Sequence, residues 1–389
     1  MRARLSSPSS TLRMARRQHL QRDSRRALLA LLGFALAASA CVAEPEERAL
    51  RNDELGRAEA PAFRFVHEGG VMHVREVGDT ALTVRASAAD FTFSLERLTP
   101  SVDTVALRLW NLPPGLQLSS APGVLTPDGA PTPGVPDAAL TLGASFAVHF
   151  PPGIDRVDVR SVAPPPGDFT FLALGDIQEA IVGFDTVVDR MNEEPDADFL
   201  LLLGDLTNRT STAELDAVEA AFSRLALPVY ATPGNHDVYT SDGYQRRFGQ
   251  TSYSFTHRGT RFTSLDSGSG TLAAATWDDV PGFLAAGRDA PHVVFTHIPV
   301  TERNGVRGGQ WASRREARQA LSDLGAAGVD LLLFGHVHSY DAYELGGIPA
   351  YISGGGGASP EAFDGIGRHY LKVRVQAGVP SVTVVRVDD

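Results

Sequence analysis

Cysteine and long apolar runs are both scarce in this chain. The 389 residues include one cysteine, Cys41, so an intramolecular disulfide is impossible. The apolar run at residues 27–40, "ALLALLGFALAASA", is shorter than the roughly 20 residues that a membrane-spanning helix needs. No segment recurs at a fixed period, so nothing indicates a repeat architecture.

Basic residues are also scarce over most of the chain. The net charge is −11, and residues 1–41 hold eight arginines and one acidic residue, so the rest carries about −18. Nucleic acids and anionic membrane surfaces bind basic patches. We therefore expect no nucleic-acid scaffold as a partner, and an anionic substrate would need a local attractor such as a metal cluster. The sequence does not indicate the oligomeric state.

The N-terminus has the three parts of an export signal. Residues 1–26 are basic, residues 27–40 are apolar, and small residues precede Cys41. The end, "ASAC", resembles a bacterial lipobox, in which the cysteine is lipidated after cleavage. Ordinary cleavage after residue 40 is the alternative. We expect residues 1–41 to direct the protein to the bacterial periplasm or cell envelope, with a lipid anchor at Cys41.

The rest of the chain divides into three parts. Residues 42–61 are polar and mostly charged, which predicts an acidic flexible linker. Residues 62–163 contain short runs of alternating apolar and polar residues, which predict a small all-β, sandwich-like domain. The Pro- and Gly-rich stretch at 121–136 predicts a long loop, and "APPPGD", 163–168, marks a boundary.

Residues 168–389 alternate strand-like and helical patterns. Near-continuous apolar strands are buried on both faces, so helices between them predict a layered α/β fold of β-sheets flanked by helices. The expected strands are 169–174, 198–203, 228–232, 292–297 and 329–334, and the expected helices are 179–193, 212–225, 276–287 and 312–327.

Each of those five strands ends in a side chain that can bind a metal. In open α/β sheets, ligands bind at the carboxyl ends of the strands, so these residues are expected to converge. A single Gly-Asp often only caps a helix, but five such ends in order indicate a metal site. His336 and His338 can share one site only if the chain has left the strand, and Gly335 allows that turn. The candidates are Asp176, Gln178, Asp205, Asn235, His297, His336 and His338.

In this pattern the chain resembles the calcineurin-like metallophosphoesterase superfamily. The motifs are "GDIQ" (175–178), "GD" (204–205), "GNHD" (234–237), the single His297 and "GHVH" (335–338). "GHVHSYD" and the later "ISGGGG" are most similar to the purple-acid-phosphatase-like branch, whose members often carry an N-terminal β-domain. The resemblance covers about residues 168–389.

The resemblance implies a dinuclear metal centre. Asp176 and His338 would hold the first metal with help from Gln178, while Asn235, His297 and His336 would hold the second. Asp205 would bridge the two, a role that suits cations about 3.5–4 Å apart. The ligands suit two divalent or mixed-valence ions, chosen from Mn, Fe, Zn or Co.

These roles predict an exported hydrolase of small-molecule phosphoric esters, either monoesters or diesters. A hydroxide that bridges the metals would attack phosphorus, and His236 would protonate the leaving alcohol. Asp237 is assigned with it as a catalytic residue that orients His236, although it could merely cap the next turn.

Two positions depart from the family pattern. Purple acid phosphatases have tyrosine where this chain has Asn208, so we expect no tyrosinate colour. Gln178 replaces the histidine of the first motif, and it would either bind the metal weakly through its amide oxygen or hold a water molecule. Gln178 is also the only support for the alternative function, a lipid-anchored binding or scaffold protein with an inactive phosphoesterase fold.

Overall fold

The computed structural model describes residues 44–121, 124–127, 142–238 and 242–387. The predicted export signal and Cys41 lie outside these ranges. Within them, no helix has both the length and the apolar character needed to cross a membrane.

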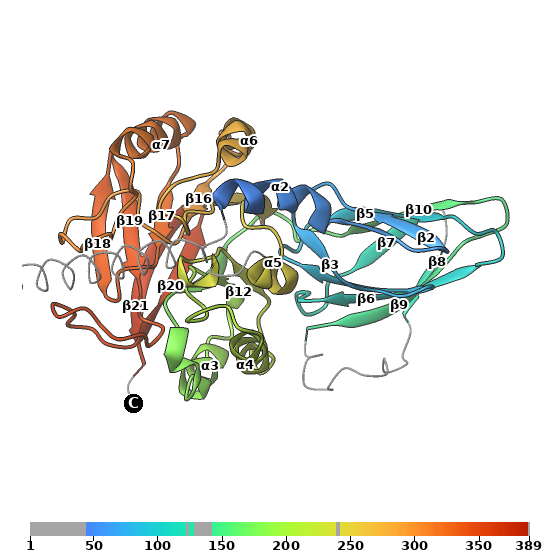
Figure 1. Cartoon of the computed structure of the whole chain (residues 1–389), viewed down its shortest axis with the longest axis horizontal. Helices are drawn as coiled ribbons and strands as arrows, with labels where there is room; N and C mark the ends of the chain where they lie inside the picture. The colour runs from blue at the N-terminus through green and yellow to red at the C-terminus, as the bar shows by residue number, and fades with distance from the viewer. Residues whose placement is uncertain (1–43, 122–123, 128–141, 239–241, 388–389) are drawn as a thin grey trace, which may run out of the picture. The chain divides into compact units, whose positions relative to one another are not determined.

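The N-terminal part contains two five-stranded sheets that pack into one apolar core (Figure 1). Inward and outward positions alternate along the strands, as in "RVDVRS", where Val157 and Val159 are fully buried. This confirms the predicted all-β domain. The first sheet runs β1 (Arg57–Glu59), β2 (Phe63–Val66), β5 (Thr92–Arg97), β10 (Arg156–Ser161) and β7 (Leu118–Ala121). The second runs β3 (Met72–Val77), β4 (Ala81–Ala86), β6 (Thr104–Trp110), β9 (Ala144–His149) and β8 (Val124–Pro127).

Strand β8 corrects one expectation. Residues 121–136 were predicted to be irregular because of their prolines and glycines, but Val124–Pro127 pairs antiparallel with β9. Pro127 is the last residue of β8, at the edge of its sheet, where a missing N–H donor is tolerated.

The C-terminal part contains two more sheets that face each other. One runs β13 (Val229–Ala231), β12 (Ala197–Leu202), β11 (Phe169–Leu174), β20 (His369–Gln376) and β21 (Val379–Arg386). The other runs β14 (Tyr253–His257), β15 (Thr260–Ser264), β16 (His292–Phe295), β17 (Leu331–Phe334), β19 (Ile348–Ser353) and β18 (Tyr340–Leu345).

Helices cover the outer faces of these two sheets, so the layers run helix, sheet, sheet, helix (Figure 1). Strand β11 shows why: Phe171 and Ala173 pack between the sheets, while Leu172 and Leu174 face the helices. This confirms the layered α/β prediction. The helices are α3 (Asp185–Asn192) and α4 (Thr212–Phe222) on one side, α6 (Ala274–Ala285) and α7 (Arg314–Ala327) on the other, and the short α5 (Gly243–Phe248).

The predicted linker is not a tether in its described part. Residues Pro45–Leu55 form helix α2, which begins with a proline in its first turn. Its Arg48 is 2% exposed and forms an ion pair with Asp266. The charged composition was therefore misleading, because one of its charges is buried against a partner 218 residues away.

The all-β domain covers an edge of the C-terminal part. The Asn111 side chain donates to the carbonyl of Val229 and accepts from its N–H, both at 2.8 Å. Val229 begins the edge strand β13, so the Asn111 amide replaces a neighbouring strand there. The same strand leads to Asn235 and His236, and this contact helps fix its position.

Candidate metal centre

The predicted residues meet where the strands of both sheets end. Two groups have ligand atoms that all lie within 4.8 Å of one another. The first half-site is Asp176, Asp205 and His338, and the second half-site is Asp205, His297 and His336. Asp205 belongs to both groups, as a bridging carboxylate must.

The loops that carry these residues have unusual backbone geometry. Asp176, Gln178, Asp205 and His336 all have positive φ, between +46° and +70°. Residues other than glycine seldom adopt this region, and such strain concentrates at functional sites. Gly234 lies so close to Asp205 that a Cβ there would be 2.1 Å from Asp205 Oδ1. The glycine before Asn235 therefore permits a close approach to Asp205.

Each of the three histidines is oriented by a backbone carbonyl. His297 Nδ1 lies 2.8 Å from the oxygen of Leu203, and His338 Nδ1 lies 2.7 Å from the oxygen of Ser359. A carbonyl only accepts, so these nitrogens carry protons and each Nε2 presents its lone pair to the centre. His336 is reversed, because its Nε2 donates to the carbonyl oxygen of Gly308 at 3.0 Å.

His336 therefore offers Nδ1 to the centre, and that atom lies 3.2 Å from His297 Nε2. The side-chain oxygen of Asn235 is 3.1 Å from the same His297 nitrogen. Three potential ligand atoms thus surround one point, and Asp205 Oδ2 completes the group at 3.3 Å from His297 Nε2. The structure therefore brings together the residues that were predicted for the second metal.

The first half-site contains a buried carboxylate oxygen, Asp176 Oδ1, that has no hydrogen-bond partner among the described residues. Asp176 is fully buried, and its other oxygen accepts from the N–H of His336 at 2.8 Å. Oδ1 instead faces His338 Nε2 at 3.4 Å. Buried charges need a partner, so this oxygen fits a cation held with His338.

The electrostatics of the metal-free protein agree with this arrangement. Burial lowers the pKa of His297, but the negative Asp205 outweighs it and raises that pKa to about 9. In the same way burial opposes charge on His338, yet Asp176 raises its pKa to about 9. Burial also opposes ionisation of Asp205, but His297 holds its pKa well below the usual value. In the metal-free protein, His297 and His338 therefore carry protons at the place where metal cations would bind.

Gln178 lies at the centre and contacts the bridging residue. Its Nε2 donates to Asp205 Oδ2 at 2.9 Å, and its side chain is 7% exposed. Gln178 begins the short 3-10 helix η2 (Gln178–Ile181). The structure therefore brings Gln178 to the predicted place, with its amide nitrogen directed at Asp205.

His236 lies beside the second half-site at the start of the 3-10 helix η3 (His236–Val238). Its backbone N–H donates to Asp205 Oδ1 at 2.8 Å, and its Nδ1 donates to the carbonyl oxygen of Asn208 at 2.9 Å. A proton transferred to substrate would therefore be carried on Nε2. Asn208 thus contributes its backbone carbonyl oxygen to the site.

The hydrogen bonds described for the Asp237 carboxylate go to backbone N–H groups and to one hydroxyl group. The carboxylate accepts from the N–H groups of Leu206, Thr207 and Gly234 and from the Thr207 hydroxyl, at 2.9–3.1 Å. Burial and the nearby Asp205 raise its pKa to about 6. Asp237 joins the loop after β12 to the loop after β13.

Two threonines that hold the loop of His236 in place, Thr207 and Thr210, were not predicted from the sequence. Thr210 has φ +57°, an unusual value for a β-branched residue, and its hydroxyl donates to the carbonyl oxygen of His236 at 3.0 Å. Its N–H donates to the Thr207 hydroxyl at 3.0 Å. No sequence pattern marks either threonine, because both act through the path of the backbone.

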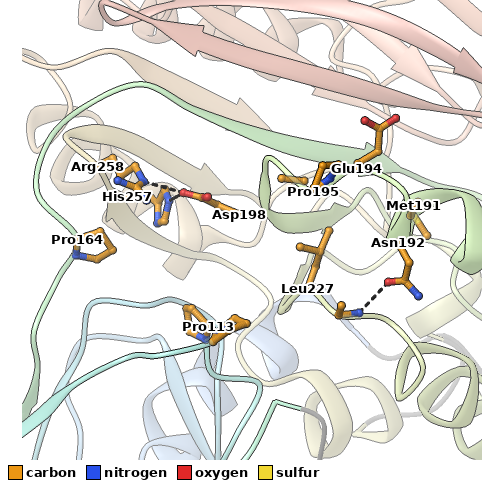
Figure 2. A pocket seen from close by; sticks show the side chains of 13 residues that line it. Pro113, Pro164, Met191, Asn192, Glu194, Pro195, Asp198, Leu227, His257 and Arg258 are labelled. Atoms are coloured by element: carbon orange, nitrogen blue, oxygen red, sulfur yellow. Dashed lines mark hydrogen bonds and ion pairs between the residues drawn. The ribbon is translucent and has the colours of Figure 1, made fainter.

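A cavity of about 360 Å³ lies at the opposite end of the sheet, where β12 begins (Figure 2). None of the predicted site residues lines it. Asp198 there accepts from His257 Nε2 and Arg258 Nε, both at 2.7 Å, so its charge is already paired. The cavity is separate from the metal centre.

Residues 169–340 match the family described as calcineurin-like phosphoesterase. No curated protein sequence matches the chain.

Several solved structures are similar. A purple acid phosphatase from seeds of yellow lupin (Lupinus luteus) has a TM-score of 0.53 at 14% identity, covering 77% of this chain and 70% of that one. A dimetal phosphatase from Danio rerio has a TM-score of 0.44 at 13% identity, covering 57% and 99%. The structure of PhoD has a TM-score of 0.46 at 12% identity, covering 81% and 88%. At 14% identity, the likeness to the lupin protein is one of fold.

Proposed function

Because the chain belongs to the calcineurin-like metallophosphoesterase superfamily and is a metal-dependent phosphoesterase, we propose that it hydrolyses small-molecule phosphoric esters at a centre of two metal ions. One observation carries this proposal: two groups of ligand atoms share Asp205. The lone pairs of three histidines, fixed by backbone carbonyls, support it.

The ligand set fits two divalent or mixed-valence ions from Mn, Fe, Zn or Co. When bound, they would supply Lewis acidity toward phosphate oxygens and a water acidified enough to act as nucleophile. Asp176, Gln178 and His338 would serve the first ion, and Asn235, His297 and His336 the second. Asp205 would serve both.

His236 is the proposed proton donor. Attack of water oxygen on phosphorus breaks the ester P–O bond, whose electron pair goes to the leaving alcohol oxygen. The proton on His236 Nε2 would neutralise that oxygen, while the bond from Nδ1 to Asn208 holds the ring in place. His236 is half-buried beside Asp205, which keeps it within the site but open to a substrate.

The test is turnover of p-nitrophenyl phosphate and its bis-ester by protein loaded separately with Mn²⁺, Zn²⁺ or Fe²⁺. We expect hydrolysis of at least one ester, lost on chelation, and the preferred ester distinguishes a monoesterase from a diesterase. Full metal loading without turnover of either ester would favour the binding or scaffold protein instead. No intense visible band is expected with iron, because Asn208 offers no phenolate.

We further propose that the enzyme acts in the bacterial periplasm or cell envelope, anchored through Cys41. The support is the sequence of residues 27–41, which lie outside the described structure. Metabolic labelling with a fatty acid should mark the wild-type protein and spare Cys41→Ser. Labelling of neither protein would leave ordinary cleavage as the better account.

A further inference from the structure

Helix α2 lies in the segment that the sequence marked as a linker, yet it contacts the surroundings of the second half-site. We propose that α2, through the buried Arg48, is a positioning element of the metal centre. This inference rests on the proposed function, because it concerns the same centre. The side chain of Arg48 bonds to Asp266 and Ser269 and acts through the loop at residues 266–269.

The pairing of Arg48 with this loop is bidentate and buried. Arg48 Nε donates to Asp266 Oδ2 at 2.9 Å and Nη2 donates to Asp266 Oδ1 at 3.1 Å. Nη2 also donates to the Ser269 hydroxyl at 3.1 Å. Asp266 is 4% exposed, so Arg48 balances a carboxylate that water barely reaches.

The next residue of the loop, Ser267, supports the segment that carries His297. Its hydroxyl oxygen accepts a hydrogen bond from the N–H of Ile298 at 2.8 Å and another from the Thr296 hydroxyl. These are the residues on either side of His297. The fully buried Ser267 therefore fixes this ligand from both sides along the chain.

The same loop also packs against the segment that carries Asn235. A Cβ at Gly268 would lie 3.0 Å from the carbonyl oxygen of Gly234 and 3.2 Å from the Val238 side chain. Asp266 Oδ1 accepts from the N–H of Gly268 at 3.0 Å, which holds this close packing. One loop thus touches the supports of two ligands of the second half-site.

Helix α2 also forms hydrogen bonds with the neighbouring helices α5 and α6. Glu46 accepts from the N–H groups of Ala274 and Ala275 at the start of α6. Gln245 of α5 donates to the carbonyl oxygen of Arg48 and to the Asn52 side chain, both at 2.9 Å. These contacts join α2 to the elements that follow the Asn235 loop and the 266–269 loop.

The expected energetic effect comes from the buried carboxylate of Asp266, which pairs with Arg48. Removing one partner of a buried ion pair leaves an uncompensated charge, which the surrounding structure relieves by moving or admitting water. Here the displaced group would be the 266–269 loop. Groups that orient metal ligands commonly change metal affinity 10- to 100-fold when lost. We expect Arg48→Met to weaken the second half-site about tenfold.

The experiment is a calorimetric titration of full-length protein with Zn²⁺, comparing wild type, Arg48→Met, Arg48→Lys and the control Arg57→Met. Arg57 is 59% exposed at the end of the same segment. We expect one of two binding steps to weaken about tenfold in Arg48→Met, less in Arg48→Lys, and not in Arg57→Met. Unchanged binding in a folded Arg48→Met protein would overturn the proposal.

A second readout uses wild-type protein and so remains if Arg48→Met does not fold. Coupling is reciprocal, so Zn²⁺ should slow amide hydrogen exchange within residues 45–55. No slowing there, despite bound Zn²⁺, would also overturn the proposal. Failure of the proposed function looks different: wild-type protein would then bind no Zn²⁺ or turn over no ester.

Discussion

Position 178 offers the sharpest perturbation of the first half-site. Gln178 Nε2 donates to Asp205 Oδ2 at 2.9 Å, and Gln178→Ala removes this donor. Loss of a group that orients a ligating carboxylate commonly weakens metal binding by about 10- to 100-fold. We expect a loss of that size for the ion held by Asp176 and His338.

Gln178→His should act in the opposite direction. Structural zinc sites with four ligands bind with about 10–16 kcal/mol, so one ligand contributes roughly 3 kcal/mol, or about 100-fold. The loss of the bond to Asp205 offsets part of this gain, which leaves a net increase of about tenfold. The backbone tolerates the change, since φ at this position is +46° and histidine is enriched in that region.

The assay is Zn²⁺ titration against a competing chelator, with Gln319→His as the control because Gln319 is exposed on α7. Gln178→Ala and Gln178→His should change the Zn²⁺ affinity in opposite directions. Equal weakening by both would show that a side chain here acts only through Asp205. Unchanged metal affinity and rate in Gln178→His would show that position 178 binds no metal.

Three further predictions concern the rest of the centre. Zn²⁺ binding should release about one proton per half-site at pH 7, and the affinity should increase about tenfold per pH unit up to about pH 9. The reason is that the pKa values of His297 and His338 are raised to about 9, whereas a metal ion binds only neutral imidazole. Calorimetry in buffers of different ionisation enthalpy measures the protons released, and no release would contradict this prediction. His236→Ala should slow hydrolysis of alkyl phosphates about 100-fold or more. Hydrolysis of p-nitrophenyl phosphate should slow much less, because p-nitrophenolate is a better leaving group and needs no proton. An equal loss of rate for both esters would argue against proton donation by His236. Thr207→Val should lower the free energy of unfolding by about 1–3 kcal/mol in urea denaturation, because it removes one hydrogen bond to the buried Asp237 carboxylate and takes away the acceptor described for the buried Thr210 N–H. A loss no larger than that of the exposed Thr212→Val would contradict this prediction.

Much of the fold and the positions of most candidate ligands followed from local sequence. Strands buried on both faces have continuous apolar runs, and after four of the five runs a glycine and a polar residue mark the point where the chain turns. Asp176, Asp205 and His297 could be placed because each directly follows such a run. The fact that the strands belong to two facing sheets has no local signature, since it depends on long-range pairing.

The supports of the site could not be predicted in the same way. The carbonyls of Leu203, Gly308 and Ser359 orient the histidines, but every residue has a carbonyl and only the path of the loop selects one. Asp237 was predicted to orient His236, but no local pattern indicated that its carboxylate would also accept from the N–H groups of Leu206 and Thr207 in another loop. Arg48 looked solvated because its partner is remote in sequence.

The most direct test of the central claim is a crystal structure of metal-loaded protein with anomalous scattering recorded for the bound metal. The account predicts two peaks about 3.5–4 Å apart, with one oxygen of Asp205 or its whole carboxylate between them. His336 should ligate through Nδ1, and His297 and His338 through Nε2. A single peak, or two peaks that do not share Asp205, would contradict a dinuclear centre.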